Sequence, residues 1–176
     1  MSQQTPVLFH SHKRGTHAAF SNWAYAPFHL NGVAYVSTEQ YMMAEKARLF
    51  GDAESEAAIM ALNAPHAGTD WEAWDAQCKA TKARGRDVKG FVKDKWDAEC
   101  RGIMVRGIVA KFEQNTEFRD LLIRTGDAPI AEASPHDSIW GIGMGATDEG
   151  AENPEQWRGT NFLGAALMQA RAQLAK

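Results

Sequence analysis

The spacing of apolar positions predicts a mainly helical chain. Apolar residues recur at intervals of three and four positions over several stretches, which is the period of one face of an α-helix. Helices are expected on this basis at residues 38–50, 54–62, 69–83, 94–114, 117–124 and 162–174. The longest stretch carries a continuous apolar stripe, made of Trp96, Cys100, Ile103, Met104, Ile108 and Phe112. These helices should supply most of the core.

A few short strands complete the pattern. Apolar runs at residues 7–10 and 129–133 predict two strands. Asn31-Gly32 separates two further apolar runs and predicts a β-hairpin, because both turn positions need a positive φ. The acidic stretch 146–157 is expected to be a mobile surface loop. Together these elements indicate the α+β class: one mainly helical domain over residues 7–176, with a loose tail at residues 1–6.

The helix expected after residue 37 carries the first candidate chemistry. Ser37 with Gln40 three residues later forms a capping-box pattern, so the helix should begin near Thr38. Glu39, Met42, Met43 and Lys46 then share one face. The two methionines should turn that face inward, so Glu39 and Lys46 border a partly buried surface about 10 Å apart, at about 1.5 Å per residue. Either a small ligand lies between them, or Lys46 snorkels from the core and Glu39 favours the helix N-terminus.

Composition narrows the class of protein. The 176 residues are 44% hydrophobic and 23% charged, as in an ordinary soluble domain. A formal net charge of −3 argues against a broad electrostatic grip on nucleic acid, although a local basic cleft remains possible. The sequence has neither a long apolar run for a membrane span nor a signal-peptide core. Cys78 and Cys100 have neither the spacing of a disulfide-rich scaffold nor that of a metal site, so we expect both to be reduced thiols in the core. Reduced thiols indicate a cytoplasmic protein.

Several loops present residues with both a structural and a ligand-binding interpretation. Asn22 precedes the hairpin and serves either an Asx-turn or a ligand hydrogen bond. Gly85 between two arginines forms a basic turn, which is either a solvated helix end or a phosphate site using Arg86. The histidines at positions 10, 12 and 17 straddle a turn without helical spacing, so no metal site is expected.

A second group of such residues lies near the C-terminus. Glycines at the alternate positions 141, 143 and 145 follow Asp137 and Trp140. They indicate either a loop whose backbone approaches something flat or phosphorylated, or an ordinary turn beside a core tryptophan. Asn161 precedes the last helix, and its default role is that of an N-cap.

In this order the pieces resemble the NADAR family, which includes the YbiA-type N-glycosidases, over roughly residues 8–174. The matching stretches lie at 20–23, 27–28, 38–41 with 44–46, 85–86, 96–97, 110–114, 132–137 with 139–143, and 161–164 with 167–168. Two departures stand out. The segment 67–83 is longer than in compact members of the family, which affects the expected shape of one wall of the cleft. Trp23 stands where the family often has Phe, and this difference affects an expected stacking contact.

The resemblance implies cleavage of the C–N bond between a ribose or ribose phosphate and a base-like amine, on a YbiA-like fold. Such a reaction needs a carboxylate beside the developing positive charge on the sugar and a proton donor for the base. Glu39 is the candidate to activate water or protonate the leaving group, and Asp137 to serve the ribose side, with the reverse assignment open. Lys46 offers a covalent route through a Schiff base with a ring-opened ribose, or else a charge for phosphate.

The remaining candidates would bind the substrate. Trp140 would stack on the base, with Trp96 as a second wall. Arg86 is the phosphate candidate, and Asn22 and Asn161 are the candidate hydrogen-bond partners for sugar or base. Gly141 of the glycine loop is a further substrate-binding candidate.

Three functions stay open. The first acts on phosphoribosylamino-pyrimidine intermediates of riboflavin synthesis. The second removes ADP-ribose from guanine, and only this one brings nucleic acid in as a partner. The third is a module that binds NAD-derived nucleotides such as ADP-ribose without cleaving them. No cofactor is expected, because the Gly141–Gly145 run does not open a βαβ unit. The sequence does not indicate an oligomeric state.

Overall fold

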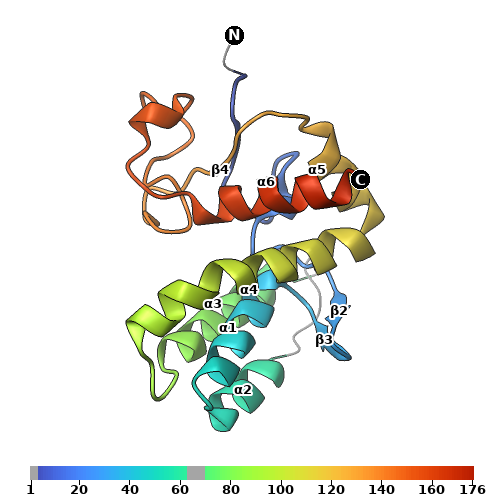
Figure 1. Cartoon of the computed structure of the whole chain (residues 1–176), viewed down its shortest axis with the longest axis vertical. Coiled ribbons are helices and arrows are strands. Elements are labelled where there is room, and N and C mark those ends of the chain that lie inside the picture. The colour runs from blue at the N-terminus through green and yellow to red at the C-terminus, as the bar shows by residue number, and fades with distance from the viewer. Residues whose placement is uncertain (1–3, 63–69) are drawn as a thin grey trace. The chain divides into compact units, whose positions relative to one another are not determined.

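The protein is described here over residues 4–62 and 70–176 of a computed structural model (Figure 1). Its elements pack into two groups, named for their place in the sequence. The central unit is Asn22–Gln114, and the terminal unit combines Met1–Ser21 with Asn115–Lys176. The predicted α+β class, mainly helical with a few short strands, is confirmed. The prediction of one domain over residues 7–176 stays a prediction.

The central unit opens with the predicted hairpin. Strands β2 (Phe28–Leu30) and β3 (Val33–Tyr35) pair antiparallel, with Phe28 opposite Tyr35. The turn residues Asn31 and Gly32 have φ values of 54° and 79°, the left-handed conformation that an Asn-Gly turn provides. The chain then enters helix α1 (Thr38–Leu49), which packs against α2 (Ala53–Met60), α3 (Trp71–Arg86) and α4 (Lys93–Gln114).

Helix α1 begins at Thr38, as its capping pattern predicts. The Ser37 hydroxyl accepts a hydrogen bond from the Gln40 backbone N–H at 3.2 Å. The Gln40 side chain does not close the box on Ser37. Its oxygen accepts from Val36 N–H at 3.0 Å, and its nitrogen donates to the carbonyls of Ile59 and Leu62 at 3.2 and 3.1 Å. One buried glutamine therefore joins the start of α1 to the end of α2.

Helix α3 corrects the prediction of a basic turn at residues 83–86. The helix continues through Gly85 to Arg86, because Gly85 lies against the Met43 side chain of α1. Tertiary packing thus overrides the helix-breaking tendency of glycine. The helix starts at Trp71, capped by Asp70, whose carboxylate accepts from Ala73 N–H at 2.9 Å. The expected start at residue 69, the break at 63–65, residues 67–69 of the long segment and residues 1–3 of the tail lie outside the described residues.

The terminal unit is built on a pair of strands from opposite ends of the chain. Strand β1 (Val7–Phe9) pairs in parallel with β4 (Ile130–Glu132), in a register that places Val7 beside Ile130. Helix α6 (Phe162–Leu174) packs against β4 and against α5 (Thr116–Arg124). Short 3₁₀ turns, η1 (Ala18–Phe20) and η2 (Pro154–Gln156), complete the unit. Both strands and the last helix lie where the sequence predicts them.

The acidic stretch 146–157 is more ordered than expected. Ala151 is fully buried, and the Trp157 indole N–H donates to the Ala151 carbonyl at 2.8 Å. Trp157 also packs against a small apolar cluster of Ala131, Ala133, Ile142, Met144 and Ala151. The charges therefore lie on a loop whose apolar residues anchor it to the core.

Cys78 and Cys100 both lie in the core, as expected, and neither forms a disulfide bond; their reduced state stays a prediction. Among the helices that the structure describes, none is long and apolar enough to cross a membrane.

Candidate functional site

Asn22 and Glu39 meet at the start of α1. Glu39 is 4% exposed, and its backbone N–H donates to the Asn22 carbonyl at 3.0 Å. The Thr38 hydroxyl donates to the carbonyl and the side-chain oxygen of Asn22, at 3.3 and 3.1 Å. The predicted place of Asn22 beside this helix start is confirmed. Because Thr38 fixes the Asn22 side-chain oxygen, the amide nitrogen is left without an acceptor among the described residues.

A buried tryptophan holds this segment in place. Trp74 of α3 is fully buried, and its indole N–H donates to the Trp23 carbonyl at 2.8 Å. Its ring also meets Tyr25 edge to face, with 5.3 Å between centroids. The sequence indicated Trp74 as a core residue but not as an anchor for the Asn22 segment. The available signal was chemical, since a buried indole N–H needs an acceptor.

Lys46 lies two turns further along α1 in a partly buried setting, as predicted. Its Nζ donates to the Gly85 carbonyl at 2.7 Å and lies 4.4 Å from the centroid of the Phe91 ring and 5.5 Å from that of Trp96. Burial lowers the pKa of Lys46 below its usual value, and the positive charge of Arg86 lowers it further. The central unit therefore brings Lys46, Trp96 and Arg86 into one neighbourhood.

Phe91 is the member of this neighbourhood that the sequence did not indicate. Its side chain is 43% exposed. The ring meets that of Phe50 edge to face, with 5.3 Å between the ring centroids, and one face of it lies against the Lys46 amine. Phe91 and Val92 are adjacent large apolar residues left exposed just before α4. An apolar pair in a linker otherwise rich in charge was the available signal.

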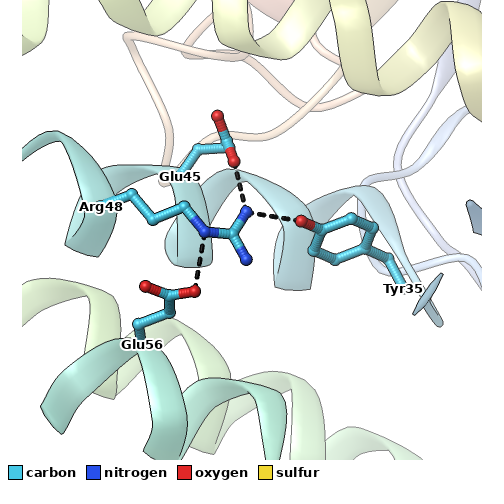
Figure 2. Close-up of polar contacts among 4 residues, drawn as sticks. All are labelled: Tyr35, Glu45, Arg48 and Glu56. Carbon is cyan, nitrogen blue, oxygen red and sulfur yellow. Dashed lines mark hydrogen bonds and ion pairs between the residues drawn. The ribbon is translucent and has the colours of Figure 1, made fainter. Parts of the chain in front are cut away.

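An ionic network fixes the other side of α1 (Figure 2). The Arg48 guanidinium binds Glu45 one turn earlier, Glu56 of α2 at 2.7 Å and the Tyr35 hydroxyl of β3 at 2.6 Å. These charge-assisted hydrogen bonds join α1 to α2 and to β3 on the side of the helix opposite Glu39 and Lys46.

In the terminal unit, Asp137 organises the loop that carries Trp140. One carboxylate oxygen of Asp137 accepts from the backbone N–H groups of Ile139 and Trp140, at 3.0 and 2.8 Å. Trp140 is half-buried, and its ring meets Phe162 edge to face at 6.0 Å. The second carboxylate oxygen of Asp137 has no partner among the described residues, so the group keeps an acceptor for a ligand.

Gly141 and Asn161 lie in the same unit, and the chain itself occupies their surroundings. A side chain at Gly141 would come within 2.9 Å of the carbonyl oxygens of Glu132 and Asp137. Asn161 sits at the N-cap position of α6, yet its side chain makes no cap. Instead the amide donates to the Ile130 carbonyl at 2.9 Å and accepts from Glu132 N–H at 3.3 Å. These contacts support a positioning role for both residues.

The candidate residues therefore fall into two groups. Asn22, Glu39, Lys46, Arg86 and Trp96 belong to the central unit, whereas Asp137, Trp140, Gly141 and Asn161 belong to the terminal unit. The convergence of both groups on one substrate stays a prediction. Within residues 4–62 and 70–176, no group of three or more His, Cys, Asp or Glu side chains is arranged to hold a metal ion.

Comparison with known proteins places the chain in a family. The model of the NADAR domain matches residues 8–175. N-glycosidase R617 of Acanthamoeba polyphaga mimivirus is 40% identical over 176 residues, covering 95% of each chain. N-glycosidase YbiA of Escherichia coli is 28% identical over 173 residues, covering 98% of this chain and 91% of its own.

The fold agrees with that of a solved relative. The NMR structure of Escherichia coli YbiA superposes with a TM-score of 0.74 at 27% identity, covering 99% of this chain and 88% of that one. This confirms the expected YbiA-like fold. The relatives' names also confirm the expectation of an enzyme of the hydrolase class that acts on N-glycosyl bonds. The chain belongs to the NADAR family.

Proposed function

We propose that the protein hydrolyses the N-glycosyl bond between a ribose phosphate and a base-like amine, with phosphoribosylamino-pyrimidine intermediates of riboflavin synthesis as its substrates. The observation that carries this is the environment of Lys46. Its amine is fixed by a carbonyl at 2.7 Å, lies beside two aromatic rings, and has a lowered pKa. A larger neutral fraction makes this amine a better nucleophile than a surface lysine.

The covalent route follows from that nucleophile. The Lys46 amine attacks the anomeric carbon and forms a new C–N bond. The bond from the same carbon to the base breaks, and the base leaves with a proton while the ribose ring opens. The resulting imine takes up one water molecule, which releases the free sugar and restores the amine. Each step balances, and the only co-reactant is water.

Two carboxylates are assigned to the proton transfers. Glu39 lies on the same buried face of α1 as Lys46, and we assign it to protonate the departing base or to activate water. Asp137 keeps one carboxylate oxygen for the ribose side, where positive charge develops. In direct hydrolysis without the covalent intermediate, the same two groups would act and Lys46 would bind phosphate.

The binding groups follow from their contacts. Exposed Arg86 beside Lys46 is assigned to the phosphate, and the amide nitrogen of Asn22 to a sugar or base oxygen. Trp140 is assigned to stack on the base, with Trp96 as the second aromatic wall. Gly141 and Asn161 shape the Trp140 loop through their backbone and strand contacts.

A second substrate class is favoured by one observation. Arg86 and Lys95 are exposed at the end of α3 and the start of α4, whereas Lys89 and Lys93 between them pair with Glu54 and Asp97. Exposed cations at these places suit a diphosphate or a polynucleotide backbone. ADP-ribosylated guanine, free or in nucleic acid, is therefore the alternative substrate.

The decisive experiment offers both substrate classes to the purified protein and follows free base and free sugar by mass spectrometry. We expect release from the pyrimidine substrate, and Lys46→Ala should lose at least about a hundredfold in turnover, the usual range for loss of a positioned catalytic group. Lys79→Ala is the matched control, because Lys79 is an exposed lysine of α3. Release from guanine substrates alone would instead establish the alternative.

Borohydride reduction during turnover separates the two chemical routes. The covalent route predicts a stable sugar adduct on Lys46 whose yield rises with pH as the amine loses its proton. An unmodified Lys46 with substantial activity in Lys46→Ala would remove that route. A non-catalytic module would behave differently. It would bind ADP-ribose but release base from no substrate, and the wild type and the Glu39→Gln/Lys46→Ala variant would give the same result. We assign the activity to the cytoplasm, because Cys78 and Cys100 are buried and form no disulfide bond, which suits a reducing compartment.

A further inference from the structure

Helices α1 and α3 pack against each other where Met43 meets Gly85. Gly85 is buried, and a Cβ atom built on it would overlap the Sδ atom of Met43, lie 2.7 Å from Cγ and 3.1 Å from Cβ. These separations are shorter than ordinary carbon contacts. Even alanine at this position would therefore move either the Met43 side chain or the helix.

The same residue supplies the acceptor for Lys46. Its carbonyl is one of the last in α3, where backbone acceptors have no partner within the helix. The Lys46 amine, one turn after Met43 on the same face of α1, donates to it at 2.7 Å. Thus one residue carries both the contact that sets the helix spacing and the atom that holds the amine.

We propose that Gly85 is a positioning residue for Lys46: its missing side chain allows α3 to dock on Met43, and this docking brings the Gly85 carbonyl to the amine. The inference rests on the proposed role of Lys46 as the reacting group.

The hydrogen bond has a directional consequence. A neutral amine that donates one N–H to Gly85 keeps its lone pair and its second N–H at the two remaining tetrahedral positions, both of which point away from the Gly85 carbonyl. The rings of Phe91 and Trp96 limit the other positions open to the amine. A well-fixed nucleophile loses little entropy when it attacks.

The test compares Gly85→Ala, Met43→Ala/Gly85→Ala and the control Gly102→Ala in α4. A Cβ atom at Gly102 meets only Arg106 Nη1 at 3.4 Å. Lys46 is labelled with acetic anhydride across pH and quantified by mass spectrometry, which reports its pKa and reactivity without any turnover. Turnover is measured separately as kcat and KM.

We expect Gly85→Ala to admit water beside Lys46 and raise the pKa of Lys46 by about one pH unit, which is a tenfold smaller neutral fraction at a fixed lower pH. Turnover should fall about tenfold in kcat with KM within about twofold. The double variant removes the Met43 Sδ and Cγ atoms that lie nearest the new methyl group, so it should return both readouts towards wild type. Gly102→Ala should leave both unchanged.

Unchanged labelling of Lys46 in a folded Gly85→Ala variant would overturn the inference, as would failure of the double variant to restore it. If Gly85→Ala does not fold, Met43→Phe adds bulk at the same contact from α1 and is judged by the same labelling criteria. A wild-type protein without glycosidase activity would defeat the proposed function, yet the labelling result would still decide the role of Gly85.

Discussion

Among the residues that the structure describes, Asn31 and Asn161 are the two asparagines in the left-handed conformation, and they adopt it for different reasons. Asn31 is exposed at the hairpin turn, where the residue type provides the positive φ. Asn161 is 4% exposed, and its side chain joins the start of α6 to the backbone on both sides of Ala131. Position 31 therefore requires only a residue that accepts a positive φ, whereas position 161 also requires the side-chain amide.

This difference gives a matched pair of substitutions. Glycine preserves a positive φ at either site, so Asn161→Gly removes chiefly the two hydrogen bonds. We expect it to lower the free energy of unfolding in urea by about 2 kcal/mol or more, because buried backbone groups of β4 lose their partners. Asn31→Gly should change it by less than about 0.5 kcal/mol. Equal effects would contradict the positioning role of Asn161.

Lys111 predicts a pH dependence of stability. It is 1% exposed in α4, and burial lowers its pKa from the ordinary 10.5 to about 7. Between those values the unfolded chain binds more protons than the folded one, so stability rises with pH through this window. Relative to that of Lys111→Met, the free energy of unfolding of the wild type should rise by up to about 1.4 kcal/mol per pH unit between pH 7 and 9.

The control for that measurement is Lys79→Met, because Lys79 is exposed on α3. The free energy of unfolding of Lys79→Met should have the same pH dependence as that of the wild type. Parallel curves for the wild type and Lys111→Met would show that the buried amine keeps an ordinary pKa.

At the scale of elements, α4 carries two glycines with opposite roles. Gly102 is exposed, whereas a Cβ atom at buried Gly107 would overlap the ring of Tyr41 in α1. We expect Gly102→Ala to stabilise the protein by about 0.5–1 kcal/mol through helix propensity. Gly107→Ala should cost about 1–3 kcal/mol, because the added methyl group separates the two helices. Thermal and urea unfolding of both variants measure the contrast, and stabilisation by both would contradict the close packing.

Element boundaries show where local reasoning sufficed. The start of α1, the Asn-Gly hairpin and the whole of α6 follow from caps, turn chemistry and periodicity, which act over a few residues. The end of α3 did not follow, because the contact that keeps Gly85 helical comes from Met43, far away in the sequence. The order of the 146–157 loop likewise depends on a burial site for Trp157.

At the scale of the whole molecule, the terminal unit depends on both ends of the chain. Val7 N–H donates to the Pro129 carbonyl, and Ala133 N–H donates to that of Phe9, each at 2.7 Å. Phe9 is 5% exposed and meets Phe20 edge to face at 5.8 Å. The central unit, in contrast, is one continuous segment.

This organisation predicts selective loss of hydrogen-exchange protection. Phe9→Ala removes a buried ring, at a cost of about 3–5 kcal/mol to the unit that contains it. We expect β4 and α6 to exchange faster while α1 and α4 keep their protection, as read by mass spectrometry of peptides. Equal loss across all four elements would instead support one cooperative domain over residues 7–176.

The sequence alone determined the elements and the types of residue that carry chemistry. Helical period, capping residues and the Asn-Gly turn are local properties, so they placed the helices and strands and put Glu39 and Lys46 on one inward face. Tertiary structure decided what each of those groups touches. Only the packing of α3 and the 87–92 loop on α1 gives Lys46 the Gly85 carbonyl and the Phe91 ring. Only the approach of α6 to β4 commits the Asn161 side chain to the strand. Such contacts join residues distant in sequence, and the period of a single helix carries no information about its neighbour.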